Sequence, residues 1–233
     1  MLEAGLAALA LDLPPDVRAA IDGHARLLLA WTEAINLTAI RDPAEVARLH
    51  VLDSLSAVPF LRERGATALL DIGSGGGYPG LPLAAALPAT RALLVDSVGK
   101  KVRFLETAIA ATGLGDRVAA EQARAETLAA DPRDREGWSV VTARAVGSLG
   151  ELIELGLPLV APDGVLVVWK RAVLDEELEA AAGALHALRA GPLTVMDPGV
   201  PGLEAHRLVV VPRGGPIEAK YPRDPAERGR RPL

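Results

Sequence analysis

The sequence predicts an α/β protein built on a mostly parallel, doubly wound β-sheet. Short apolar runs alternate with helical segments from residue 67 onward, a pattern typical of parallel strands joined by crossover helices. A glycine-rich loop follows the first run, and in this architecture ligands bind at the carboxyl ends of the strands. The last two runs have no clear helix between them. We therefore expect seven strands, of which the last two form an antiparallel hairpin at one edge.

Residues 1–64 precede the first strand and predict an N-terminal helical extension. Apolar residues from Val17 to Ile35 recur at helical spacing and form one face. The pattern breaks at residues 36–38. A further helix is expected to begin at residues 42–43, Asp-Pro, because aspartate caps helices and proline is tolerated in the first turn.

The remaining elements follow from the alternation of apolar runs and helical segments. Strands are expected near residues 67–71, 91–96, 117–121, 138–142, 164–169, 192–197 and 206–212. Helices are expected near residues 80–87, 98–112, 124–130, 147–159 and 172–189. The edge hairpin then turns at residues 198–202. These elements divide the chain into the helical extension 1–64, an α/β core 65–213 and a basic C-terminal tail 214–233.

The composition excludes several kinds of chemistry. The 233-residue chain has no cysteine, so it has no disulfide, thiolate metal site or cysteine nucleophile. Its four histidines lack the spacing of metal ligands, and we expect no metal. No apolar run is long enough to span a membrane, and the first residues lack the basic start of a signal peptide. We therefore expect a cytoplasmic protein without a membrane contact.

The charge distribution bears on nucleic-acid binding. The net charge of −5 is not typical of a general nucleic-acid binder. Basic residues nevertheless gather from Arg213 onward, and a basic tail can contact phosphates. The alternative is that these residues only form a solvated, partly ordered tail.

The glycine-rich loop after the first strand is the strongest functional signal. Asp71 ends the strand, and Gly73, Gly75 and Gly77 follow. Glycine lets the backbone turn sharply and approach a ligand closely. Such loops serve two kinds of cofactor, dinucleotides and S-adenosylmethionine. A third interpretation is a glycine turn with a purely structural role.

Three features favour S-adenosylmethionine over a dinucleotide. Tyr78 stands where the dinucleotide motif G-x-G-x-x-G has its third glycine. Pro79 and Pro82 lie where the first helical turn is expected, and each removes an N–H donor that a pyrophosphate would use. The carboxylate of Asp71 would repel a pyrophosphate, whereas it suits the ammonium group of S-adenosylmethionine.

A second acid lies at the end of the next strand. Asp96 comes about twenty residues after the glycine loop, where a carboxylate can accept hydrogen bonds from a ribose diol. The alternative is that Asp96 only caps the helix that follows.

The end of the fourth strand faces the reacting group in this architecture. Residues 140–145 lack the Asn or Asp with two prolines and an aromatic that amine methyltransferases place there, and the chain lacks the cysteine that pyrimidine carbon methylation generally needs. The remaining easy target is an atom with an available lone pair and no proton, such as guanine N7. Its methylation needs alignment of the reactants and no general base.

Basic residues gather at the predicted carboxyl ends of the strands. Arg144 follows the fourth strand and either binds the cofactor carboxylate or an RNA phosphate, or pairs with a glutamate at the surface. Lys100 begins a helix, where a cation opposes the macrodipole unless an anion is nearby, so we expect a phosphate contact. Arg124 and Lys170 follow the third and fifth strands. Together these residues give an acidic protein a basic rim.

Several stretches of the sequence together match one family pattern. They are NLTAI at 36–40, HVLDSL at 50–55, the loop at 71–83, DSVGKK at 96–101, RAE at 124–126, ARA at 143–145 and YPR at 221–223. In this combination, which covers most of the chain, the protein resembles the bacterial 16S rRNA guanine-N7 methyltransferases, the glucose-inhibited division protein B family. The resemblance implies a Rossmann-like class I methyltransferase fold.

The resemblance also implies roles for individual residues. It implies cofactor contacts at Gly73, Tyr78, Ala125, Glu126 and Arg144, and RNA contacts or catalytic roles at Lys100, Arg124, Arg144 and Lys170. Taken with the motifs above, the catalytic candidates are Arg144 and Lys100. The cofactor candidates are Asp71, Gly73, Gly75, Gly77, Tyr78, Asp96, Ala125, Glu126 and Arg144, and the RNA candidates are Lys100, Arg124, Lys170 and Arg223.

The implied reaction moves a methyl group from S-adenosylmethionine to N7 of one guanine in 16S rRNA. The implied partner is 16S rRNA or the small ribosomal subunit, and we expect a monomer. The guanine is expected to be presented from a loop and held by stacking, for which Tyr78 and Tyr221 are candidates. The alternatives are a methyltransferase acting on another RNA, a protein or a small molecule, a binding module without catalysis, and a dinucleotide oxidoreductase.

Overall fold

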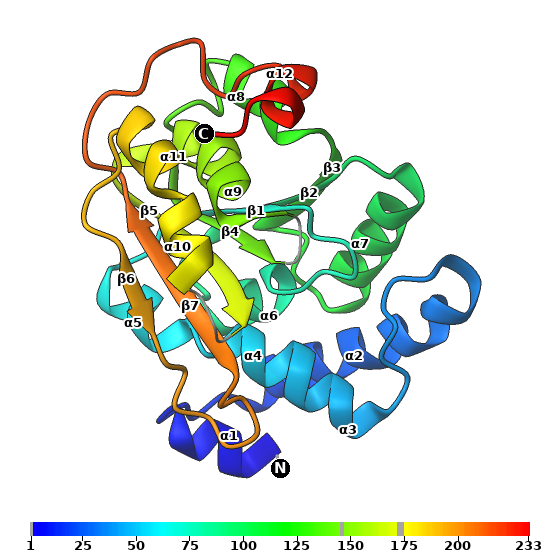
Figure 1. Cartoon of the computed structure of the whole chain (residues 1–233). Helices are drawn as coiled ribbons and strands as arrows, with labels where there is room; N and C mark the ends of the chain where they lie inside the picture. Colours follow the sequence, from blue (N-terminus) through cyan, green and yellow to red (C-terminus); the bar gives the residue numbers. More distant parts are fainter. Residues whose placement is uncertain (1, 145–146, 172–174) are drawn as a thin grey trace. The chain divides into compact units, whose positions relative to one another are not determined.

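The computed structural model describes residues 2–144, 147–171 and 175–233 (Figure 1). Its strands form a seven-stranded sheet in the order β3-β2-β1-β4-β5-β7-β6. The chain divides into two compact units. The first unit contains Met1–Gln122 and Pro198–Glu204, and the second contains Ala123–Asp197 and Ala205–Leu233.

The first unit contributes three parallel strands. They are β1 (Ala68–Ile72), β2 (Arg91–Asp96) and β3 (Val118–Gln122), and β2 pairs with both neighbours in parallel register. All five residues of β1 are buried, as expected for a strand covered on both faces. The helices α6 (Gly80–Ala86) and α7 (Gly99–Ala111) connect the strands. The carboxyl ends of β1 and β2 therefore open onto the same edge, where the glycine loop lies.

Helices before β1 make up the rest of the first unit. They are α1 (Leu2–Ala8), α2 (Pro15–Ile35), α3 (Pro43–Val46), the π-helix η1 (Ala47–Leu52), α4 (Asp53–Leu55) and α5 (Val58–Glu63). Asn36 ends α2 in the left-handed conformation, with φ 50°. Asp42 caps α3 by accepting a hydrogen bond from the N–H of Glu45 at 2.9 Å. The helix α2 packs against α6 and α7, with Trp31 edge-on to Phe104 at 5.6 Å between ring centres.

The second unit contains the antiparallel part of the sheet. Its strands are β4 (Trp138–Arg144), β5 (Val160–Arg171), β6 (Thr194–Met196) and β7 (His206–Pro212). β4 and β5 are parallel, whereas β7 is antiparallel to both β5 and β6. Its helices are α8 (Ala125–Ala130), α9 (Leu149–Gly156), the 3₁₀ turn η2 (Leu157–Leu159), α10 (Asp175–Ala180), α11 (Ala182–Ala187) and α12 (Pro225–Arg230).

The predicted fold class is confirmed, including seven strands and an antiparallel edge. Three local predictions need correction. β5 begins at Val160, earlier than expected, because this residue pairs with Trp138 ahead of a bulge. One helix was predicted over 172–189. From residue 175 onward the structure has two short helices there, α10 and α11, and residues 172–174 lie outside the described residues. The π-helix η1 was not predicted, because a π-turn leaves no simple periodicity in the sequence.

No helix in the described part of the chain is both long and apolar enough to cross a membrane.

Candidate functional site

The glycine loop between β1 and α6 is a tight turn with three glycines in the left-handed conformation. Gly73, Gly75 and Gly77 have φ values of 71°, 54° and 84°, in the left-handed region that strains other residues. Two backbone hydrogen bonds fix the loop: Ser74 N–H donates to Val95 O at 2.9 Å, and Gly77 N–H donates to Ser74 O at 2.7 Å. The loop is therefore hydrogen-bonded to the end of β2.

Asp71 lies near the end of β1. Its side chain is only 1% exposed, and its Oδ2 accepts a hydrogen bond from Gly80 N–H at 3.2 Å. The carboxylate therefore caps the N-terminus of α6 inside the protein. A direct contact between Asp71 and the cofactor ammonium group stays a prediction.

The start of α6 has no donor left for a phosphate. Gly80 N–H is bound to Asp71, Leu81 N–H donates to Gly77 O at 2.8 Å, and Leu83 N–H donates to Pro79 O at 3.2 Å. Residue 82 is proline and has no N–H. A pyrophosphate at this loop needs free N–H groups of the helix. The geometry therefore excludes the dinucleotide mode of binding here and fits a cofactor without phosphate.

Asp96 joins the loop to the next helix. Its Oδ2 accepts from Gly75 N–H at 3.0 Å, and its Oδ1 accepts from Val98 N–H at 2.9 Å. The ammonium of Lys101 lies 3.6 Å from Asp96 Oδ2. The sequence left open whether Asp96 binds a ribose or only caps the next helix. In the structure it caps α7 and also contacts the glycine loop. Each carboxylate oxygen keeps a lone pair, so the position suits a ribose diol.

Tyr78 lies in a stack of three rings that the sequence did not predict. Its ring is 5% exposed and lies between His24, at 4.3 Å between ring centres, and His50, at 4.9 Å. His50 Nε2 is 2.8 Å from Thr38 Oγ1. This burial corrects the idea that Tyr78 stacks on the guanine. The one signal in the sequence was that His24 lies on the apolar face of α2 between Ile21 and Leu28.

His24 of α2 contacts the backbone of the glycine loop. Its Nε2 lies 2.8 Å from Gly76 O, so the ring carries its proton on Nε2 and donates it to this carbonyl. Burial lowers the pKa of His24 from 6.5 to about 4, and this effect outweighs the opposing hydrogen bond to Gly76. The imidazole is therefore neutral at pH 7.

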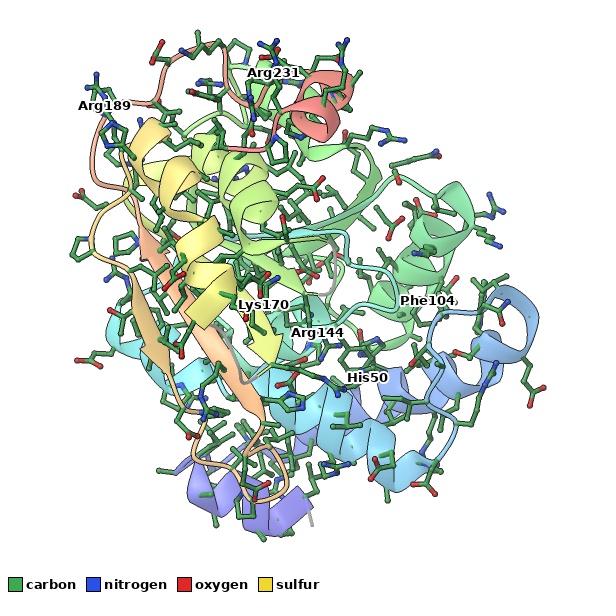
Figure 2. All side chains as sticks on the ribbon, in the orientation of Figure 1. His50, Phe104, Arg144, Lys170, Arg189 and Arg231 are labelled. Carbon is green, nitrogen blue, oxygen red and sulfur yellow. The ribbon has the colours of Figure 1, made fainter. Side chains whose placement is uncertain are left out.

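Two predicted basic residues lie at the carboxyl ends of neighbouring strands in the second unit (Figure 2). Arg144 is the last residue of β4 and is paired in register with Trp169, which precedes Lys170 on β5. The Lys170 side chain is 13% exposed, and its ammonium binds Glu177 at 2.5 Å and Gly147 O at 2.9 Å. Glu177 also accepts from Leu149 N–H at 2.8 Å. Lys170 is thus held at the strand end by internal acceptors.

The turn at Arg124–Glu126 begins α8. Arg124 is exposed, and its carbonyl accepts the N–H groups of Thr127 and Leu128. The carboxylate of Glu126 binds Arg228 Nη2 at 2.5 Å. The Glu126 side chain therefore points toward the C-terminal tail. The cofactor contacts of Ala125 and Glu126 stay a prediction, and in this arrangement the backbone would make them. Local sequence patterns do not indicate the pairing of Glu126 with Arg228, because the two partners are 102 positions apart.

Arg223 and Tyr221 of the C-terminal tail have side chains that are largely shielded from solvent. The Arg223 side chain is 11% exposed and forms a paired hydrogen bond with Glu154, with Nε at 2.8 Å and Nη2 at 2.7 Å. Tyr221 is 6% exposed. The Arg223 guanidinium is thus engaged by Glu154, and its contact with RNA phosphates stays a prediction. Lys100 and Arg124, in contrast, are exposed.

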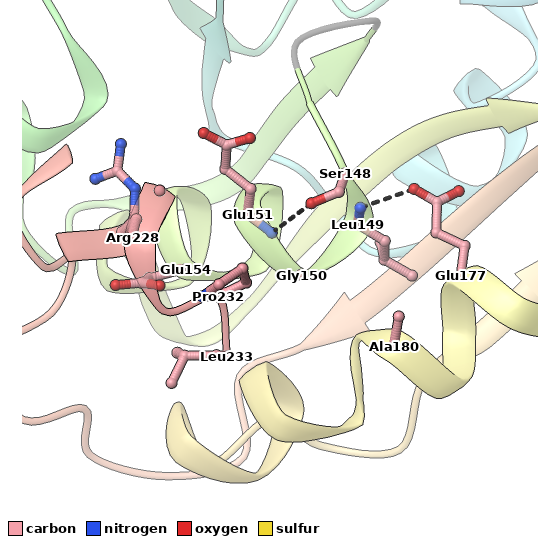
Figure 3. A pocket seen from close by; sticks show the side chains of 11 residues that line it. Ser148, Leu149, Gly150, Glu151, Glu154, Glu177, Ala180, Arg228, Pro232 and Leu233 are labelled. Carbon is pink, nitrogen blue, oxygen red and sulfur yellow. Dashed lines mark hydrogen bonds between the residues drawn. The ribbon is translucent and has the colours of Figure 1, made fainter. Parts of the chain in front are cut away.

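A cavity of about 270 Å³ lies beside the C-terminal residues in the second unit (Figure 3). Arg228, Pro232 and Leu233 line one side, and the start of α9 and Glu177 line the other. None of the predicted cofactor or RNA residues lines it, so it is separate from the candidate site. Within the described ranges, no group of three or more histidine or acidic side chains is placed to hold a metal ion.

The strand order, the glycine loop and the acids at the ends of β1 and β2 define a Rossmann-like methyltransferase fold. Solved structures share this fold. An O-methyltransferase from Bacillus cereus in complex with SAH matches with a TM-score of 0.59 and 17% identity, covering 81% of this chain and 90% of that one. An O-methyltransferase from Thermotoga maritima matches with a TM-score of 0.56 and 13% identity, over 82% and 73% of the two chains.

Sequence comparison identifies the family within this class. The family model described as rRNA small subunit methyltransferase G matches residues 18–199. Proteins named ribosomal RNA small subunit methyltransferase G are 40% identical in Roseiflexus castenholzii, over 88% of this chain and 87% of that protein, and 38% identical in Geobacillus kaustophilus, over 92% and 90%. The chain therefore belongs to the rRNA small subunit methyltransferase G family.

Proposed function

We propose that this enzyme transfers a methyl group from S-adenosylmethionine to N7 of one guanine in 16S ribosomal RNA, in the cytoplasm. Family membership supports the reaction and its rRNA substrate. The observation that carries the cofactor class is the start of α6, where every N–H of the first turn is either bound or missing. Such a helix start suits an adenosyl cofactor that brings no phosphate to the loop.

The first unit supplies one set of proposed cofactor contacts. The backbone of Gly73, Gly75 and Gly77 shapes the loop, and the carboxylate of Asp96 accepts the ribose hydroxyls. Both assignments are supported by the direct hydrogen bond between Gly75 N–H and Asp96. Asp71 acts indirectly by fixing α6, and Tyr78 acts by packing the loop against the ring stack.

The second unit supplies the remaining proposed contacts. Ala125 and Glu126 contribute backbone groups at the start of α8, and Arg144 contributes its guanidinium at the end of β4. Arginine suits a carboxylate or phosphate because its planar fork donates two parallel hydrogen bonds. The enzyme is proposed to act as a monomer with the extension, core and tail predicted from the sequence.

The proposed reaction requires the protein mainly to align the methyl donor with guanine N7. When bound, S-adenosylmethionine supplies an electrophilic methyl group, whose bond to sulfur breaks as its bond to guanine N7 forms. Guanine N7 offers a lone pair and has no proton to lose, so no general base is needed. Holding the two reactants in line then accounts for most of the rate gain. Arg144 and Lys100 are proposed to orient the donor and the RNA.

Two exposed residues are proposed to contact RNA phosphates. Lys100 lies in the first turn of α7, and Arg124 directly precedes α8. Both are exposed and are therefore available to a large polyanion, whose binding gains from the release of counterions. Lys170 is proposed to contribute positive charge from its fixed place on β5, without making a mobile contact.

The test of the proposal uses labelled S-adenosylmethionine with 16S rRNA and small subunits from cells that lack this modification. We expect one labelled guanine, mapped by cleavage at 7-methylguanine. The Arg144→Ala variant should lose most methyl incorporation or donor affinity. Labelling of another nucleotide, or of no RNA in either preparation, would contradict the assignment. If Arg144→Ala kept wild-type values for both quantities, Arg144 would lie outside the site.

A further inference from the structure

The C-terminal residues 221–233, which we name the C-terminal strap, are held against the second unit by buried contacts. Arg223 binds Glu154 of α9 through two guanidinium hydrogen bonds, and its own N–H donates to Glu154 at 2.9 Å. The Glu154 side chain is only 2% exposed. At the other end, Leu233 packs on Gly183 of α11, where an added Cβ would lie 2.8 Å from Leu233 C. The strap is therefore part of the folded structure.

The Arg228 side chain links the middle of the strap to Glu126 of α8. Its Nη2 binds the Glu126 carboxylate at 2.5 Å, and its Nη1 donates to Arg223 O at 2.8 Å. The side chains of Arg228 and Glu126 are 9% and 22% exposed. A pair so shielded from water loses much solvation, and breaking it leaves an uncompensated charge. It is therefore a firm link between the strap and α8.

The link meets α8 at its second residue. Arg124 precedes the helix with φ −102° and ψ 149°, and no side chain caps this end. The internal hydrogen bonds of the turn run from Thr127 and Leu128 to Arg124 O. The ion pair adds a fixed point to Glu126 from outside the helix. Arg228 is thus a contact from outside the helix that restrains the side chain of Glu126.

We propose that Arg228 is a positioning residue for S-adenosylmethionine. By holding the Glu126 side chain on the strap, it keeps the backbone of Ala125 and Glu126 turned toward the cofactor. This inference rests on the proposed function, which assigns the cofactor contact to that backbone. The strap therefore serves donor binding through α8.

The experiment measures binding of S-adenosylhomocysteine and S-adenosylmethionine to the full chain by calorimetry, together with kcat and KM on rRNA. Arg228→Met is expected to weaken cofactor binding about tenfold, within the range of typical coupling energies. Its KM for the donor should rise by the same factor, whereas kcat at saturating donor should stay unchanged. Arg228→Lys, which keeps the charge, should recover part of the affinity.

A double-mutant cycle separates positioning from general damage. Glu126→Gln should weaken binding as Arg228→Met does, and the two changes together should cost no more than either one, because they remove the same contact. Arg230→Ala is the matched control, since Arg230 lies exposed on the same helix and its Nε donates to Ala226 O within that helix. It should bind like the wild type.

Wild-type affinity in folded Arg228→Met and Glu126→Gln would overturn the inference, as would an equal loss in Arg230→Ala. If Arg228→Met failed to fold, Arg228→Lys and Glu126→Gln would decide in its place. A wild-type chain that bound neither compound would overturn the proposed function and this inference with it. Failure of the inference alone leaves wild-type binding intact, so the two results are distinct.

Discussion

Two aspartates at strand ends show how similar sequence signals have different roles. Asp96 binds Gly75 N–H and Val98 N–H, so it joins the glycine loop to α7. Asp71 is buried and accepts a hydrogen bond from Gly80 N–H at the start of α6. Both were predicted at the ends of strands from the sequence. Their partners were not, because the direction of a carboxylate depends on backbone N–H groups that the local pattern does not place.

At the scale of one residue, the buried His24 predicts a pH dependence of stability. Its pKa is about 4 in the folded protein, lowered from the ordinary value of 6.5. Between these pH values the unfolded chain binds a proton that the folded chain does not, so the free energy of unfolding falls as pH falls from 6.5 to 4. The loss attributable to this group is about 3 kcal/mol. Urea unfolding at a series of pH values measures it.

The His24→Asn variant should be less stable at pH 7, because it loses the stacked ring. Its unfolding free energy should also fall less steeply between pH 6.5 and 4 than that of the wild type. The control is His186→Asn, whose ring is exposed on α11 and which should keep the wild-type slope. Equal slopes for His24→Asn and the wild type would show that His24 does not carry the effect.

At the scale of elements, the fit of α6 against β1 and β2 depends on Gly80. A Cβ at this position would lie 2.5 Å from Leu94 Cδ2 and 2.7 Å from Asp71 Oδ2. Gly80→Ala should therefore destabilise the protein by about 1–3 kcal/mol through overpacking. Unfolding by denaturant measures the change.

Gly23→Ala is the matched comparison for Gly80→Ala. Gly23 lies inside α2, and nothing lies within 4 Å of an added Cβ. Alanine there should raise stability by about 0.5–1 kcal/mol, because glycine loses more backbone freedom on folding. If both substitutions changed stability in the same direction, the close approach of α6 to Asp71 would not explain the choice of glycine at position 80.

The elements themselves were largely predictable, and the reasons differ by type. Strands such as β1 and β2 are short apolar runs with clear ends, so their bounds agree to within a residue. The early start of β5 depends on its pairing with Trp138 on another strand. The π-turns of η1 and the ring stack beneath Tyr78 arise from packing between distant segments. Local periodicity carries no information about such contacts.

At the scale of the molecule, the Arg223–Glu154 pair fastens the strap. Burial raises the pKa of Glu154, but the hydrogen bonds from Arg223 outweigh it and lower the pKa overall. Arg223→Met leaves a buried carboxylate without compensation and should cost about 3–5 kcal/mol near pH 7. Thermal or urea unfolding measures this loss.

The pH dependence of that loss identifies its cause. A carboxylate with a lowered pKa stabilises the fold above its unfolded value of 4.5, and this contribution disappears as pH falls through the folded pKa. The difference between Arg223→Met and the wild type should therefore shrink in acid. The double variant Glu154→Gln with Arg223→Met should recover part of the stability. A deficit that stayed constant with pH would point to lost packing as the cause.

The position of β7 between β5 and β6 has a consequence for synthesis of the protein. Val165 to Arg171 of β5 pair with β7 along its whole length, yet β7 begins 35 residues after β5 ends, at His206. Until the ribosome has delivered those residues, a strongly apolar strand presents an open row of N–H and C=O groups to other chains. Nascent chains stalled before residue 206 should therefore depend on chaperones, whereas chains extended past residue 212 can close this edge themselves.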